Sequence, residues 1–166
     1  MMHFLTPIRE LPSEVKNFIA AFLVVLNVGF FSGLTFVGQT ESTTPDGVVE
    51  NYNGNEEIED APVMKFKKSQ REMLTIVHTH ILSMSFIFFF MGGLLAMTSI
   101  SKKWKQFLMI EPFASVLVTF GGIYMIWYGV EWFAYVVVFS GTLMTATFII
   151  ATLLIFKELY LSKKPL

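Results

Sequence analysis

Residues 73–97, MLTIVHTHILSMSFIFFFMGGLLAM, combine a long apolar run with two of the chain's three histidines near its start. His78 and His80 are therefore the residues whose type is best suited to chemistry. Neutral imidazole is a good ligand for haem iron, copper and zinc, and histidine also changes protonation state near neutral pH. The pair is a candidate site for a haem, a transition metal, a quinone or a proton.

The spacing of the two histidines limits this chemistry. Residues two apart on a regular helix differ by about 200° around its axis, so both imidazoles cannot chelate one ion there. Three arrangements remain. One histidine is an axial ligand to a haem between helices, or each ligates a separate centre, or the helix begins unwound and both bind one ion.

Helical spacing also predicts which imidazole faces the interior of a bundle. Small residues follow His78 at intervals of seven, seven and four: Ser85, Gly92 and Ala96. Because small residues allow helices to approach closely, this stripe predicts that His78 points into the bundle and that His80 does not.

Two further side chains are predicted on the same membrane side as the histidines. Tyr128 would hydrogen-bond a ligand, and Glu131 would orient an imidazole as a carboxylate partner. His3 is predicted on the opposite side. A haem b would therefore need a non-histidine ligand, a five-coordinate iron, the two histidines in unusual geometry, or a histidine from a partner. The alternative is that both histidines only hydrogen-bond the loop backbone or Glu131 and anchor the start of the helix.

Four uncharged runs must position these residues. The chain has 166 residues, of which 54% are hydrophobic, and a soluble domain of this size has too little interior to bury such an excess. Each run contains the ~20 residues that a helix needs to cross ~30 Å of hydrocarbon. The sequence predicts an all-α fold, a single-domain four-helix transmembrane bundle, with helices at about 17–38, 73–98, 108–130 and 132–156 and one acidic extracytoplasmic loop at 39–72. No small-x-small cleavage site follows the first run, which favours a retained helix over a signal peptide.

Basic residues are divided unevenly between the two membrane sides. Eight of the twelve are predicted on the side that holds both termini: Arg9, Lys16, Lys102, Lys103, Lys105, Lys157, Lys163 and Lys164. The positive-inside rule therefore places both termini in the cytoplasm, and Trp127 and Trp132 mark the outer interface.

The predicted extracytoplasmic loop contains two turn signals, Pro45-Asp46-Gly47 and Asn53-Gly54. Its acids lack the spacing of a calcium loop, which favours a solvated loop over a divalent-cation site. These acids are Glu56, Glu57, Glu59 and Asp60.

Composition excludes several classes of site. The chain has no cysteine, so disulfides, thiolate metal sites and cysteine nucleophiles are excluded. A net charge of −1 gives no support for nucleic-acid binding. A transporter is not favoured, because no charged residue is predicted near mid-membrane and no repeat is evident.

Two other features concern contacts between helices. Gly29 and Gly33 form a GxxxG spacing that favours close packing within the bundle, with a homodimer or with another membrane subunit. Glu111 precedes Pro112, and we interpret it as a helix-start residue at the inner interface. The alternative is a buried acid on a proton path.

Four short motifs resemble the sequences of uncharacterised small bacterial membrane proteins: Tyr52-Asn53-Gly54, Met73-Leu74, His78-Thr79-His80 and Glu111-Pro112-Phe113. The resemblance covers most of the chain after the first span. It implies a four-helix inner-membrane protein with a Tyr-x-Gly loop motif and HxH at the outer end of the second helix, and it brings no established activity.

The sequence thus favours a small integral membrane subunit associated with respiratory or electron-transfer machinery, with a histidine-based site near the outer face. The alternative is a non-redox structural or assembly subunit. In either case the expected partners are the lipid bilayer and other membrane subunits or a second copy of the chain.

Overall fold

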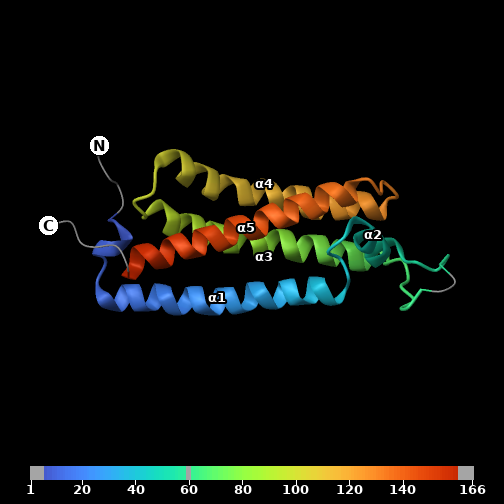
Figure 1. Cartoon of the computed structure of the whole chain (residues 1–166), viewed down its shortest axis with the longest axis horizontal. Helices are drawn as coiled ribbons and strands as arrows, with labels where there is room; N and C mark the ends of the chain where they lie inside the picture. The colour runs from blue at the N-terminus through green and yellow to red at the C-terminus, as the bar shows by residue number, and fades with distance from the viewer. Residues whose placement is uncertain (1–5, 59–60, 161–166) are drawn as a thin grey trace.

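The structure is a computed structural model that describes residues 6–58 and 61–160 (Figure 1). It contains a short 3-10 helix and five α-helices: η1 (Ile8–Glu10), α1 (Ser13–Gln39), α2 (Pro45–Asn53), α3 (Gln70–Ala96), α4 (Lys102–Trp127) and α5 (Phe133–Tyr160). The described residues include no strand. All the α-helices except α2 are long and apolar enough to cross a membrane. The predicted all-α bundle with four transmembrane helices is therefore confirmed.

The long helices lie side by side and define two ends of the bundle (Figure 1). The η1 end contains η1, the α3–α4 connection and the last turn of α5. The α2 end contains α2, the α4–α5 turn and the start of α3. At the η1 end, the Ile8 N–H donates to the Met97 carbonyl at 2.9 Å, and the Tyr160 hydroxyl donates to Asn17 Oδ1 at 3.2 Å. These bonds join η1 to the α3–α4 connection and the end of α5 to α1.

The closest approach between helices is between α4 and α5. A Cβ atom on Gly122 would lie 2.7 Å from Val137 Cγ2, so only glycine permits this contact without a shift. One turn away, the hydroxyls of Thr119 and Ser140 form a hydrogen bond of 2.7 Å. Small and hydroxyl side chains thus bring these two helices together, as expected for helix packing in lipid.

Helix α1 covers the bundle with one face only. Leu23 and Phe30 are buried, and the Phe30 ring stacks on Phe148 of α5 with centroids 3.8 Å apart. Gly29 and Gly33 are exposed, and a Cβ atom on either would meet nothing within 4 Å. The GxxxG spacing is therefore not used for packing within this chain. Its use by a second copy or another subunit stays a prediction.

The segment predicted as the loop 39–72 contains a helix. Thr44 Oγ1 accepts the Gly47 N–H, and Pro45 takes the first helical position, so Pro-Asp-Gly begins α2 where a turn was predicted. Helix α2 packs against the ends of α4 and α5. Asn53 Nδ2 donates to the Ile126 carbonyl at 2.8 Å, which gives this acceptor at the end of α4 a second donor beside the Gly129 N–H.

The chain turns back sharply after α2, as the Asn53-Gly54 signal predicts. Gly54 has a φ of 86°, and a Cβ atom there would lie 2.8 Å from Lys67 N. Asn55 Oδ1 accepts the Lys65 N–H at 2.7 Å, and its Nδ2 donates to the Val63 carbonyl at 3.0 Å. These hydrogen bonds therefore join the end of α2 to the strand-free segment that precedes α3.

We expect Gly54→Ala to destabilise the protein more than Gly129→Ala does. Both glycines have positive φ, 86° and 96°, which costs an L-residue about 1–2 kcal/mol. Only at Gly54 would the added methyl meet backbone atoms closer than 3 Å, which raises the expected loss to about 2–4 kcal/mol. Thermal unfolding in detergent micelles, followed by circular dichroism, measures the difference. Equal losses for the two variants would contradict this account of the turn.

Candidate functional site

The helix that carries both histidines begins with a complete capping box. Ser69 Oγ accepts the Glu72 N–H at 3.3 Å, and the Glu72 carboxylate accepts the Ser69 N–H at 2.8 Å. Helix α3 is then regular from Gln70 to Ala96. The arrangement in which an unwound helix start lets both histidines bind one ion is therefore wrong.

The two imidazoles point in different directions, but it is His80 that contacts the bundle. Its ring stacks on Phe120 of α4 with centroids 4.8 Å apart, whereas His78 is exposed. The prediction that His78 points inward is therefore wrong. A seven-residue spacing drifts by about 20° per step on a straight helix, so counting back twice from the buried Gly92 moves off the packed face.

His80 is held in one tautomer by its own helix. Its Nδ1 lies 2.8 Å from the Ile76 carbonyl oxygen. A carbonyl only accepts, so Nδ1 carries the proton, and in the neutral ring Nε2 keeps its lone pair. Nε2 makes no hydrogen bond within the described residues. It is also not one of the fully buried polar atoms that lack a partner, so a ligand can reach it. An imidazole oriented through a backbone carbonyl is the usual arrangement of a metal-ligating histidine.

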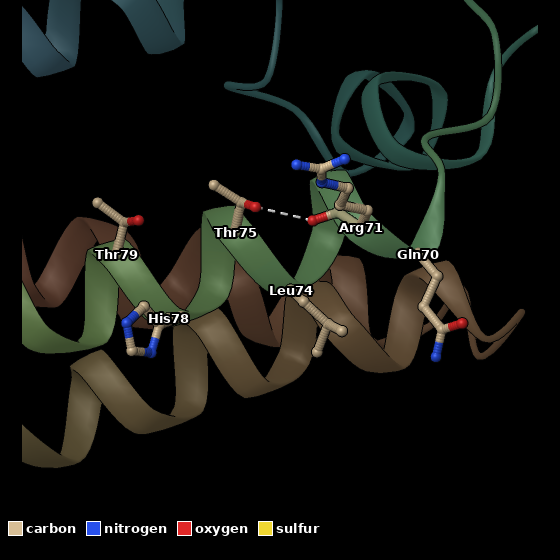
Figure 2. Close-up of a pocket in the computed structure, with 6 residues that line it drawn as sticks. All are labelled: Gln70, Arg71, Leu74, Thr75, His78 and Thr79. Atoms are coloured by element: carbon tan, nitrogen blue, oxygen red, sulfur yellow. Dashed lines mark hydrogen bonds between the residues drawn. The ribbon is translucent and has the colours of Figure 1, made fainter.

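His78 lines a shallow, open hollow on the exposed side of α3, which we call the α3 polar face (Figure 2). All of its lining residues come from this one helix: Gln70, Arg71, Leu74, Thr75, His78 and Thr79. Arg71, Thr75 and Thr79 point to one side of the hollow, and His78 points to the other (Figure 2). Thr75 Oγ1 donates to the Arg71 carbonyl at 2.8 Å, so the Arg71 guanidinium and the His78 imidazole are the polar groups offered outward.

The depth of these histidines follows from Trp127. Its Nε1 donates to the Lys68 carbonyl at 2.7 Å, just before α3 begins. Phe120, which stacks on His80, lies seven residues or about 10 Å from Trp127 along α4. His78 is about 3 Å nearer to the α2 end than His80. His78 therefore lies about 7 Å from the level of Trp127 toward the η1 end, and its side chain is exposed.

The structure does not bring Tyr128 or Glu131 to the imidazoles. Tyr128 is exposed at the end of α4, and its ring packs against Trp127 with centroids 5.0 Å apart. Glu131 is exposed and lines a different hollow, together with Asp46 and Glu50 of α2. The described residues show no hydrogen bond between Glu131 and either histidine. The role of both residues in binding a ligand stays a prediction.

The acids of the segment between α2 and α3 were the other candidate cation ligands. Glu56 and Glu57 are exposed, whereas Glu59, Asp60 and also His3 lie outside the described residues. Within residues 6–58 and 61–160, no group of three or more histidine or acidic side chains is placed to hold a metal ion. Metal binding at His78 or His80 stays a prediction.

The carboxyl of Glu111 forms a second polar site, between α4 and α5. Helix α4 begins at Lys102, so Glu111 lies nine residues or about 13 Å inside it. Thr147 of α5 donates to Glu111 Oε2 at 2.6 Å, and Ser115 donates to Oε1. Our interpretation of Glu111 as a helix-start residue is wrong.

A sequence signal for this second site existed. Glu111, Ser115 and Thr119 follow one another at intervals of four on α4, and Ser140 and Thr147 are seven apart on α5. Each set therefore shares one helix face. Two polar stripes of this kind on consecutive spans indicate a buried polar contact between them.

Outside the spans, Tyr52 of the Tyr-x-Gly motif is perturbed by the fold. Burial raises the pKa of its phenol, and a hydrogen bond with the Asn51 side chain partly opposes that effect. The Tyr52 carbonyl accepts the Lys68 N–H at 3.1 Å. The motif therefore ties α2 to the start of α3, and the phenol is kept neutral.

Comparison with known proteins gives one match. Residues 42–166 match a family model described as a transmembrane helical domain. The matched region contains α2 to α5 and leaves out α1. No curated protein and no solved structure matches the chain.

We expect spin labels at positions 78 and 80 to differ in mobility. The chain has no cysteine, so His78→Cys and His80→Cys each carry one label. A nitroxide at 78 should move freely in detergent, like one at the neighbouring exposed Thr79, whereas a nitroxide at 80 should be immobilised against Phe120. Electron paramagnetic resonance line shapes measure this. An immobilised label at 78 and a free one at 80 would reverse the assigned orientation.

Proposed function

The chain belongs to a family of transmembrane helical domains, and from this premise we propose that it is a small subunit of a larger membrane complex associated with respiratory or other electron-transfer machinery. A haem, a transition metal or a quinone then sits against the α3 polar face, with His78 as ligand or hydrogen-bond partner. One observation carries the proposal: His78 is exposed on α3, a helix long and apolar enough to cross a membrane. With Trp127 at the membrane interface, His78 would lie at hydrocarbon depth.

Exposing an ionisable side chain to lipid costs free energy, which argues that another molecule covers His78 in the membrane. Ionisable residues within a membrane usually face the protein interior or a water-filled cavity, because lipid offers them no partner. His78, Thr75 and Thr79 line one hollow, so a second subunit or a cofactor placed over it removes several polar groups from lipid at once. Arg71, about 10 Å nearer to the α2 end, supplies positive charge for the propionates of a haem b.

His80 is the second candidate ligand in this proposal. The backbone hydrogen bond at Nδ1 directs the Nε2 lone pair away from the Ile76 carbonyl. Because the two rings point in different directions, each histidine would serve a separate centre.

A non-redox structural or assembly subunit is the second candidate function. It is favoured by the exposed Gly29 and Gly33 on α1, where a neighbouring helix can approach closely. The neighbour in that case is a second copy of the chain or another membrane subunit.

We place the protein in the bacterial inner membrane, with both termini in the cytoplasm. Basic side chains at the η1 end support this orientation: Arg9, Lys16, Lys102, Lys103, Lys105 and Lys157. At the α2 end, Lys65 is paired with Glu41 and Glu50, so its charge is partly neutralised. The charge difference between the ends favours retention of the η1 end in the cytoplasm.

Thiol labelling of intact cells tests the orientation. A membrane-impermeant maleimide should modify Glu57→Cys in intact cells and Lys103→Cys only after permeabilisation, because both side chains are exposed at opposite ends. Each variant carries a single cysteine. Labelling of position 103 alone in intact cells would invert the topology.

Absorption spectra and metal analysis of the purified native complex test the proposed site. We expect a Soret band or a stoichiometric metal that is lost in His78→Ala and retained in the matched control Thr79→Ala. If the Soret band or the metal is lost only in His80→Ala, the site is at His80 and not at His78. A complex without chromophore, metal or bound quinone, assembled normally in both histidine variants, would contradict the redox proposal and favour the structural one.

A further inference from the structure

We propose that Glu111, held by Ser115 and Thr147, is a proton-binding site inside the membrane. The carboxylate takes one proton from a hydronium ion, which leaves a neutral carboxylic acid and a water molecule. This site is independent of His78 and of any cofactor on the α3 polar face.

The position of Glu111 on α4 and the position of Thr147 on α5 give the same depth for the site. Glu111 lies 16 residues or about 24 Å from Trp127 along α4. Thr147 lies 15 residues or about 22 Å from Trp132 along α5. With both tryptophans at one interface of a ~30 Å hydrocarbon layer, the carboxyl lies inside that layer and nearer to its η1 side.

The two hydroxyls are committed to the carboxyl. A helical serine or threonine ordinarily donates to the carbonyl four residues earlier, as Thr142 does to Val138. Ser115 and Thr147, both buried, donate to Glu111 instead. Pro112 lacks an N–H, so the Leu108 carbonyl beside the site also loses its normal helical donor.

No charged group within the described residues neutralises this carboxylate. Helix α5 faces it with Thr147 and α4 with Ser115, while α3 meets α4 two residues earlier, where the uncharged Gly92 lies beside Met109. The nearest titratable groups along the interface are Lys105, six residues earlier on α4, and Glu158, eleven residues beyond Thr147 on α5. Lys105 donates to the Ala96 and Thr98 carbonyls, and Glu158 accepts from Ser99, all at the η1 end.

These surroundings favour a proton over a metal cation as the ligand. The ionised form has no counter-charge in a low-dielectric environment, so a proton is the direct way to neutralise it. The carboxyl oxygens also touch both hydroxyls directly, which leaves no room for an ion between them. In the neutral form the acid proton is donated to one of the two hydroxyl oxygens, which accept as well as donate.

Infrared difference spectroscopy of the protein in liposomes tests the proposal. As the pH is lowered, the carbonyl stretches of all protonated carboxyls grow in, and we expect Glu111 to contribute the amplitude of one group. Subtracting the spectra of Glu111→Gln isolates this Glu111 band, and the control Glu158→Gln should retain it. Thr147→Val should shift the band, whereas Thr142→Val, an exposed threonine on the same helix, should not.

Several outcomes would overturn the proposal. They are a Glu111 band that is constant over the whole pH range in which the protein stays folded, titration spectra that Glu111→Gln leaves unchanged, and a Glu111 band that sodium or lithium removes at fixed pH. If Glu111→Gln does not fold, the carboxyl band of Ser115→Ala and Thr147→Val tests the proposal instead. A band that is unshifted in both variants rejects Glu111 as the site.

Discussion

The hydrocarbon of a bilayer offers no hydrogen-bond partner, so every polar group inside it is satisfied by the protein or by something the protein binds. Thr119 pairs with Ser140, and Thr147 with Glu111. The His80 ring donates to its own helix. The His78 imidazole instead faces outward from the bundle, and Thr152 Oγ1 is buried without a partner among the described residues. The outward position of His78 is why we assign a binding role to the α3 polar face.

The same constraint explains the ordered cap at the α2 end. Helix α4 ends there with carbonyls that lack helical donors, and Asn53 from α2 supplies one. Trp127 in turn donates to the Lys68 carbonyl, one residue before the cap of α3. The contacts of α2 and Trp127 therefore fix the position of the start of α3 relative to α4, and with it the positions of both histidines along the bundle.

Sequence reasoning predicted the four spans well, because length and hydropathy determine them without knowledge of contacts. It missed α2, since Pro-Asp-Gly is compatible with both a turn and a helix start, and Thr44 as the N-cap was not weighed. It chose the wrong histidine because helical drift accumulates over two heptads. It places Glu111 at a helix start because the uncharged run from Pro112 is long enough to span and proline suits a first helical turn, although α4 begins at Lys102.

The central claim is that another molecule covers the α3 polar face in the native membrane. Photo-crosslinking in cells at native expression tests it most directly, with a photoreactive residue at Thr79 or Thr75 and, as control, at Leu117, an exposed apolar position on α4. The account predicts that positions 75 and 79 yield adducts to the same membrane subunit, identified by mass spectrometry, or to a cofactor, and that 117 yields lipid adducts only. Lipid adducts alone at all three positions would contradict it.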